Sequence, residues 1–281
     1  MRSLVHLLVA AAAFCGTAAP IAGPTAAQIL TPIDQMEPAS LRLTDGWREE
    51  DGSRIVALVF DLQPGWKTYW RAPGELGIPP QFDWSGSQNL AQADPLWPVP
   101  DIYEAMGMRY PAFADRLVLP VRLRAQNPAL PVTVRMNAFF GVCEDVCMPA
   151  EAYVEAALPP DSGQGVEAAL IQTALADRPL DAETGGLASV ECALRPDGYV
   201  VELTATMTFY AAFAAEIVMI EAPIEDLWIS DPVVRQDGSR VTATTRLDYF
   251  GEGPLVLDRD RLRFTVIGPD GAVEVSGCPS G

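Results

Sequence analysis

The stretch Val132-Thr-Val-Arg-Met-Asn-Ala-Phe-Phe-Gly-Val-Cys-Glu-Asp-Val-Cys-Met-Pro149 decides the fold. Its first part is rich in β-branched and aromatic residues, which favour a β-strand, and a second strand-like run begins at Met148. A three-residue hairpin loop between the runs would place Cys143 opposite Cys147, with Cα atoms about 4.5 to 5.5 Å apart. That distance is within disulfide reach. One helical turn would also bring the two thiols together, but the flanking residues argue against a helix.

Short strand-like runs also occur in the rest of the chain, and the 25 Pro and 22 Gly of the whole sequence interrupt them. Such spacing is typical of antiparallel sandwiches. We predict an all-β fold with two tandem immunoglobulin-like β-sandwich domains, covering residues 28–158 and 187–281. A linker, residues 159–186, carries one short helix with Val166, Ala169, Leu170 and Ala174 on its apolar face. The predicted strands are Ser40–Gly46, Arg54–Leu62, Leu117–Arg124, Val132–Phe140, Met148–Ala156, Ser189–Leu194, Tyr199–Thr206, Glu216–Ile220, Arg240–Leu247, Leu262–Ile267 and Val273–Ser276.

Residues 1–27 have the pattern of an export signal. Arg2 precedes an apolar run from Leu4 to Cys15, and small residues follow up to Ala27, near which we expect cleavage. No later stretch reaches the roughly 20 apolar residues that a transmembrane helix needs. We therefore expect an exported protein that is not embedded in the membrane; the periplasm as its compartment is what the family resemblance described below implies.

Removal of the signal would leave four cysteines, and an even number in an oxidising compartment suggests two disulfides. Three pairings are possible, and separation in sequence favours Cys143 with Cys147 and Cys192 with Cys278. The loop closed by the second pair would stabilise the fold by roughly 4 to 5 kcal/mol, the loop closed by the first by only about 2 kcal/mol. We predict a structural disulfide between Cys192 and Cys278, and a functional site at the short pair.

Composition excludes several classes of function. The net charge of −18, without a basic cluster, disfavours binding to nucleic acid. The single His, His6, lies in the predicted signal, so the exported chain would lack the commonest general base and metal ligand. Thiol chemistry remains, and no cofactor is expected.

Two acidic residues lie between the paired cysteines. Glu144 and Asp145 would raise the pKa of a neighbouring thiol and disfavour its thiolate. We expect the reduced pair to react slowly with arbitrary disulfides and to depend on a docked partner. The alternative is a hairpin clip with a purely structural role.

Several motifs together resemble a known family. The stretch Gly141-Val-Cys-Glu-Asp-Val-Cys-Met-Pro149 and the stretch Pro64-Gly-Trp-Lys-Thr-Tyr-Trp-Arg-Ala-Pro-Gly-Glu-Leu-Gly-Ile-Pro-Pro80 are similar to the N-terminal periplasmic domain of the thiol:disulfide interchange proteins DsbD and ScsB. Leu96-Trp-Pro-Val-Pro100 and Asp115-Arg-Leu-Val-Leu-Pro-Val121 fit the same pattern. The resemblance covers roughly residues 39–157, and the second half resembles the extra β domain of ScsB-like proteins only loosely.

The resemblance implies an immunoglobulin-like redox module that relays reducing equivalents between a thioredoxin-like or membrane donor and periplasmic acceptors. It implies that Cys147 forms the mixed disulfide and Cys143 resolves it. It also implies an aromatic cap loop over the pair, for which Tyr103, Tyr110 and Phe113 are the candidates. The expected partners are thioredoxin-fold proteins and a membrane electron conduit, which we do not expect within this chain itself.

The resemblance further suggests that the segment around Lys67 and Tyr69 lies beside the cysteine hairpin, where the only lysine would offset Glu144 and Asp145. In the alternative interpretation, Trp66 and Trp70 are core residues and Lys67 is simply solvated.

Two other classes of function stay open. Cys143, Cys147 and Met148, with Met106, Met108 or Met136, are soft ligands suited to Cu(I), as in a copper-tolerance protein. A non-catalytic assembly factor with structural disulfides is the third class.

Overall fold

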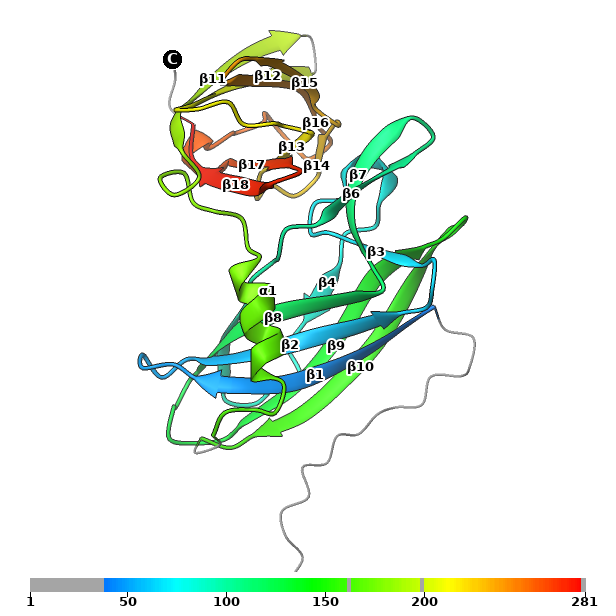
Figure 1. Ribbon diagram of the computed structural model, residues 1–281, viewed down its shortest axis with the longest axis vertical. Helices are drawn as coiled ribbons and strands as arrows, with labels where there is room; N and C mark the ends of the chain where they lie inside the picture. Colours follow the sequence, from blue (N-terminus) through cyan, green and yellow to red (C-terminus); the bar gives the residue numbers. More distant parts are fainter. Residues whose placement is uncertain (1–37, 161–162, 198–199, 279–281) are drawn as a thin grey trace, which may run out of the picture.

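A computed structural model describes residues 38–160, 163–197 and 200–278. The predicted signal peptide and its cleavage site lie outside these residues. Figure 1 shows an all-β chain in two bodies, one built from the strands up to β10 and the other from β11 onward. The strands of the first body are β1 (Ala39–Arg48), β2 (Arg54–Leu62), β3 (Lys67–Tyr69), β4 (Gln81–Asp83), β5 (Leu90–Pro95), β6 (Asp101–Ala105), β7 (Met108–Ala114), β8 (Arg116–Ala125), β9 (Val132–Cys143) and β10 (Cys147–Leu158).

The first body consists of two antiparallel sheets. One has the order β1-β2-β8-β5, and the other has the order β10-β9-β3-β7-β6, with β4 paired to β9. Five of these strands, β3 to β7, were not among those predicted, because they are short or contain Pro. The segment 101–113, predicted as a loop, is mostly the hairpin β6–β7.

The core of the first body lies between its two sheets. Along β9, Val134, Met136, Ala138 and Phe140 are buried and alternate with more exposed neighbours. This period of two points one set of side chains at the facing sheet. The alternation therefore fixes the register with which β9 reaches Cys143.

Strand β2 is buried on both faces. Val56, Leu58 and Phe60 join the core between the sheets, while the residues between them lie against helix α1 (Ala168–Ala176). The helix inserts Ile171, which is fully buried. The linker helix therefore packs on the first body, as Figure 1 shows.

The predicted face of this helix was partly wrong. Val166 lies before the helix and is fully exposed, Ala169 is exposed and Leu170 is half-buried. Of the four residues predicted, Ala174 alone is buried. The helix begins later than the pattern suggested, so its buried stripe is shifted.

The second body contains β11 to β18 in two further antiparallel sheets, one of five strands and one of three. Its core residues, such as Leu203, Met207 and Val241, again alternate along their strands. The strands are β11 (Leu187–Asp197), β12 (Val200–Phe209), β13 (Ile217–Glu221), β14 (Leu227–Ile229), β15 (Val233–Asp237), β16 (Arg240–Tyr249), β17 (Arg263–Gly268) and β18 (Gly271–Ser276). Strands β14 and β15 were not predicted.

Within the part of the chain that the structure describes, no helix has the length and apolar character to cross a membrane.

Candidate functional site

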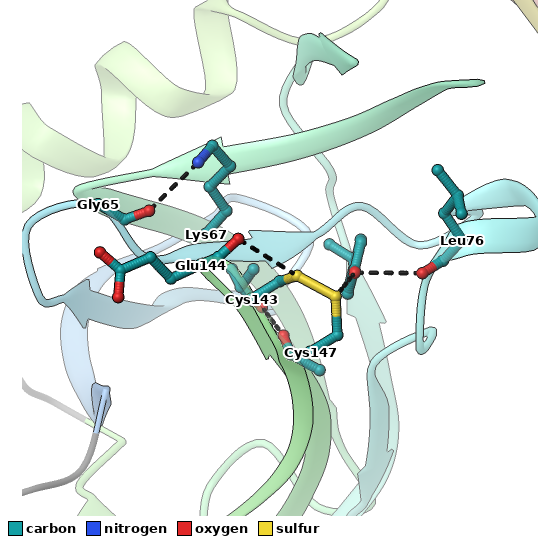
Figure 2. Close-up of a disulfide and its surroundings, with 9 residues drawn as sticks. Gly65, Lys67, Leu76, Cys143, Glu144 and Cys147 are labelled. Carbon is teal, nitrogen blue, oxygen red and sulfur yellow. Dashed lines mark hydrogen bonds between the residues drawn. A yellow bond between two sulfur atoms is a disulfide. The ribbon is translucent and has the colours of Figure 1, made fainter. Parts of the chain in front are cut away.

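The cysteine pair closes the hairpin between β9 and β10. Cys143 and Cys147 face each other in the register, with Cα atoms 4.1 Å apart and an S–S distance of 2.02 Å. Glu144, Asp145 and Val146 form the loop, and all three are exposed. The disulfide thus lies at the hairpin end of β9 and β10, and Figure 2 shows its surroundings in close-up.

The two sulfur-bearing residues differ in accessibility. Cys143, the last residue of β9, is only 7% exposed, whereas Cys147, the first residue of β10, is exposed. Val146 and Met148 on either side of Cys147 are also exposed, at 71% and 39%. An attacking thiol can therefore approach the bond from the side of Cys147.

Strand β3 lies directly beside the cysteine strand. Lys67 is opposite Cys143, and Thr68 is opposite Val142 and donates a hydrogen bond of 2.9 Å from its hydroxyl to the carbonyl oxygen of Gly141. The sequence motif around Lys67 and Tyr69 is thus brought to the pair, as the resemblance implied.

The hydroxyl of Tyr69 reaches the sulfur of Cys147. It lies 2.9 Å from Sγ of Cys147 and 3.2 Å from the carbonyl oxygen of Leu76, to which it donates. A Cβ at Gly141 would come within 2.8 Å of the Tyr69 ring, so the absence of a side chain there lets the ring lie against β9. Burial raises the pKa of Tyr69, with Tyr110 adding to the effect, so the phenol keeps its proton and remains a donor.

The hairpin β6–β7 supplies two further aromatics. The ring centroid of Tyr110 lies 5.7 Å from that of Tyr69 and 6.0 Å from that of Tyr103. These rings and Cys143 belong to one small apolar cluster. Burial, with Asp101 as a further cause, raises the pKa of Tyr103 to about 12. Two of the three cap candidates therefore cover the buried side of the disulfide.

The third cap candidate, Phe113, lies elsewhere. It is buried in the core of the first body and stacks on Trp97, with ring centroids 6.3 Å apart. Because side chains alternate along β7, Phe113 points away from the face that carries Tyr110 and Ala112. Trp70 is also fully buried, as the alternative interpretation of its segment expected.

The ammonium group of Lys67 does not bind the acidic loop. It donates to the carbonyl oxygen of Gly65 at 3.2 Å and lies 5.1 Å from the centroid of the Tyr103 ring, a cation–π contact. Within residues 38–160, no ion pair joins Lys67 to Glu144 or Asp145. Lys67 thus contacts the Tyr103 ring instead of neutralising the charges of the loop.

The second disulfide has a different setting. Cys192 on β11 and Cys278 after β18 are bonded with Cα atoms 5.6 Å apart, and both are buried in the core of the second body.

Sequence analysis missed Leu76, whose backbone carbonyl holds the Tyr69 hydroxyl. No sequence signal could have found it, because any residue supplies a carbonyl. Among the described residues, no group of three or more His, Cys, Asp or Glu could hold a metal ion. The copper hypothesis stays a prediction.

Comparison with known proteins gives two matches. Residues 42–159 match the family model for the N-terminal domain of the thiol:disulfide interchange protein DsbD. Among solved structures, the N-terminal periplasmic domain of ScsB from Proteus mirabilis is similar in fold, with a TM-score of 0.62 and 20% sequence identity. That match covers 86% of this chain and 92% of the other, so it includes both bodies. No curated protein matches the sequence.

Proposed function

Because residues 42–159 form a domain of the DsbD N-terminal family, we propose that this protein carries out thiol:disulfide exchange through Cys143 and Cys147. The observation that carries the proposal is the asymmetry of the pair: one sulfur belongs to an exposed residue beside a tyrosine hydroxyl, and the other to a buried residue. A bond that served only stability would need no such difference in access.

The exchange begins when a thiolate of a reduced donor attacks Sγ of Cys147. A donor–Cys147 disulfide forms, the Cys143–Cys147 bond breaks, and its electron pair leaves on Cys143, which takes up a proton. The donor's second thiolate then attacks the donor sulfur of the mixed disulfide and releases Cys147 as a thiolate. The donor is oxidised by two electrons and the pair is reduced by two.

The second half-reaction returns these electrons to an acceptor. The Cys147 thiolate attacks an acceptor disulfide, and one acceptor sulfur leaves as a thiolate. Cys143, once deprotonated, attacks Sγ of Cys147, re-forms the bond and releases the acceptor as a dithiol. Tyr69 donates to the Cys147 sulfur whenever it is negatively charged.

The proposal includes the finer predictions made from the sequence. The partners are thioredoxin-fold proteins of the periplasm and a membrane electron conduit, and the chain itself is exported. The two bodies are tandem immunoglobulin-like sandwiches with the bounds predicted above. Support comes from the family match and from the four antiparallel sheets.

The test is to trap the mixed disulfide. The full chain with Cys143→Ala is mixed with an oxidised thioredoxin-fold protein, and we expect a covalent complex that reductant dissolves. The matched control is Cys147→Ala, which leaves only the buried thiol and should trap far less. Equal trapping by both variants, or none by either, would refute the assignment of Cys147 as the exchanging thiol.

A further inference from the structure

The segment that carries Tyr69 is held by the second body. After β3 the chain runs through Arg71 to the short 3-10 helix η1 (Gly74–Leu76), which ends at the carbonyl that binds the Tyr69 hydroxyl. Residues of the second body contact both Arg71 and η1. The geometry of Tyr69 at Cys147 is therefore set from two sides.

The first anchor is Asp231, which lies between β14 and β15. Its Oδ1 accepts a hydrogen bond of 3.1 Å from the backbone N–H of Glu75. A Cβ at Gly74 would lie 2.3 Å from the same oxygen, and Gly74 has a φ of +71°. The Asp231 carboxylate therefore contacts η1 at Gly74 and Glu75, directly before Leu76.

The second anchor is Arg71, whose side chain is mostly buried. Its Nε lies 3.0 Å from Oε1 of Glu221, and its Nη2 bonds Oε2 of Glu221 at 2.9 Å and also contacts Glu274. The guanidinium also lies 4.0 Å from the centroid of the Trp70 ring. Planar, bidentate pairing of this kind fixes orientation as well as distance.

The contact between the bodies is also apolar. Four side chains of the second body, Ile217, Met219, Ile267 and Ala272, belong to the same buried cluster as the core of the first body. Because a shared core resists rigid-body movement, the two anchors act from a fixed support.

The hydroxyl of Tyr69 has one proton and two acceptors. While Cys147 is in the disulfide or is a thiol, the proton can go to the carbonyl oxygen of Leu76. When Cys147 becomes a thiolate, the negative sulfur is the stronger acceptor, and the hydroxyl can turn to it without moving the ring. Figure 2 shows both dashed contacts, from the labelled Leu76 and from Cys147, converging on one hydroxyl.

We propose that Asp231 and Arg71 are positioning residues, through which the second body holds the Tyr69 hydroxyl at bonding distance from the Cys147 sulfur. The positioning of Tyr69 does not depend on the proposed function, but its role in thiol:disulfide exchange rests on that function. The second body is thereby part of the redox site, although none of its described side chains makes a hydrogen bond to a sulfur of the pair.

The test uses the full chain with Cys143→Ala, in which Cys147 is the one free thiol of the described residues. The rate of its alkylation by iodoacetamide is measured against pH to give the thiol pKa. Adding Tyr69→Phe should raise that pKa by about one unit, the worth of one hydrogen bond to a charged group. Because a more basic thiolate is also more nucleophilic, alkylation below the pKa should slow by only about threefold.

The anchor is then removed. Asp231→Ala should raise the Cys147 pKa by about half a unit. Because Asp231 acts through the Tyr69 hydroxyl, the two substitutions should be non-additive, and the effect should vanish when Tyr69 is already Phe. Asp231→Asn keeps an oxygen for the Glu75 N–H and should restore most of the shift. Asp237→Asn, an exposed carboxylate on the same body, is the matched control and should leave the pKa unchanged.

An equal shift from Asp231→Ala with and without the Tyr69 hydroxyl, or no shift at all, would overturn the inference. Thermal melting of each variant shows that it is folded. Gly74→Ala gives an independent perturbation, because the added Cβ would displace the Asp231 carboxylate, and it should also raise the pKa of Cys147. The readout needs no partner protein. A pKa that responds as expected in a chain that traps no partner would leave the anchors standing and refute the proposed function.

Discussion

The two disulfides of this chain are the same covalent bond in opposite settings. Cys143 and Cys147 are four residues apart and lie at the mouth of a hairpin, whereas Cys192 and Cys278 are 86 residues apart and both are buried. The first bond closes a loop too short to restrict the unfolded chain strongly, and the second closes most of a body. Access and loop length together distinguish an exposed bond that closes a short loop from a buried bond that closes a long one.

Removing the long bond should have the largest effect on stability. The double substitution Cys192→Ala and Cys278→Ala should lower the free energy of unfolding by about 4 to 5 kcal/mol, measured by urea denaturation, because the unfolded chain gains the entropy of an 86-residue loop. Mixed-disulfide formation at Cys147 should persist in the molecules that remain folded. A smaller loss than for the short pair would break the comparison.

Removing the short bond should cost less and abolish exchange. With Cys143→Ala and Cys147→Ala, the free energy of unfolding should fall by about 2 kcal/mol, since a loop of a few residues restricts little. Transfer of reducing equivalents to an acceptor should disappear, measured by alkylation of acceptor thiols. Retained transfer would mean that other thiols carry the activity.

The acidic loop should produce a smaller effect, confined to the short pair. At about 6 Å in water two unit charges interact by about 0.7 kcal/mol, so Glu144→Gln should lower the pKa of the reduced Cys147 by about half a unit. Alkylation against pH measures it, and the difference should shrink in high salt. A difference that is independent of salt would point to a change in packing instead of charge.

The smallest effect is expected at the linker, outside both disulfides. The partly buried Arg42–Glu167 ion pair ties the start of α1 to β1, and the hydrogen bond from Arg42 lowers the pKa of Glu167. This contribution is present above the unfolded pKa of Glu, about 4.3, and is lost as the pH falls through the lowered value of the folded state.

Glu167→Gln should therefore reduce stability at pH 7 by about 0.5 kcal/mol, with no difference from the parent chain well below pH 4. Urea denaturation at both pH values checks this. The rate at which a thiol reductant reduces either disulfide should be unchanged. A changed rate would show that the linker is coupled to the disulfides.

The sequence predicted the parts of this site that depend on local pattern. Alternation along Val132–Phe140 and the spacing of the two cysteines were enough to place a cross-strand pair, and the disulfide forms in that register. The hairpin β6–β7 was missed. In the structure, Met106 and Gly107 both have positive φ and form a two-residue turn of the kind that hairpins favour.

The contacts between the bodies were beyond prediction from one sequence. Arg71 and Glu221 are 150 residues apart, and neither differs in type from the many exposed charges of the chain. Likewise, Phe113 was a cap candidate because the resemblance places its segment where the family has an aromatic cap loop. Only the strand register shows that it points into the core.

Lys67 has a practical consequence. It is the only lysine in the chain, and its amine lies over the Tyr103 ring, on a strand paired with Cys143. An amine-directed fluorophore would therefore attach, apart from the chain terminus, at a single side chain beside the redox pair. Its emission would report changes around the Tyr103 ring and the redox pair, without adding a cysteine that would confuse the thiol chemistry.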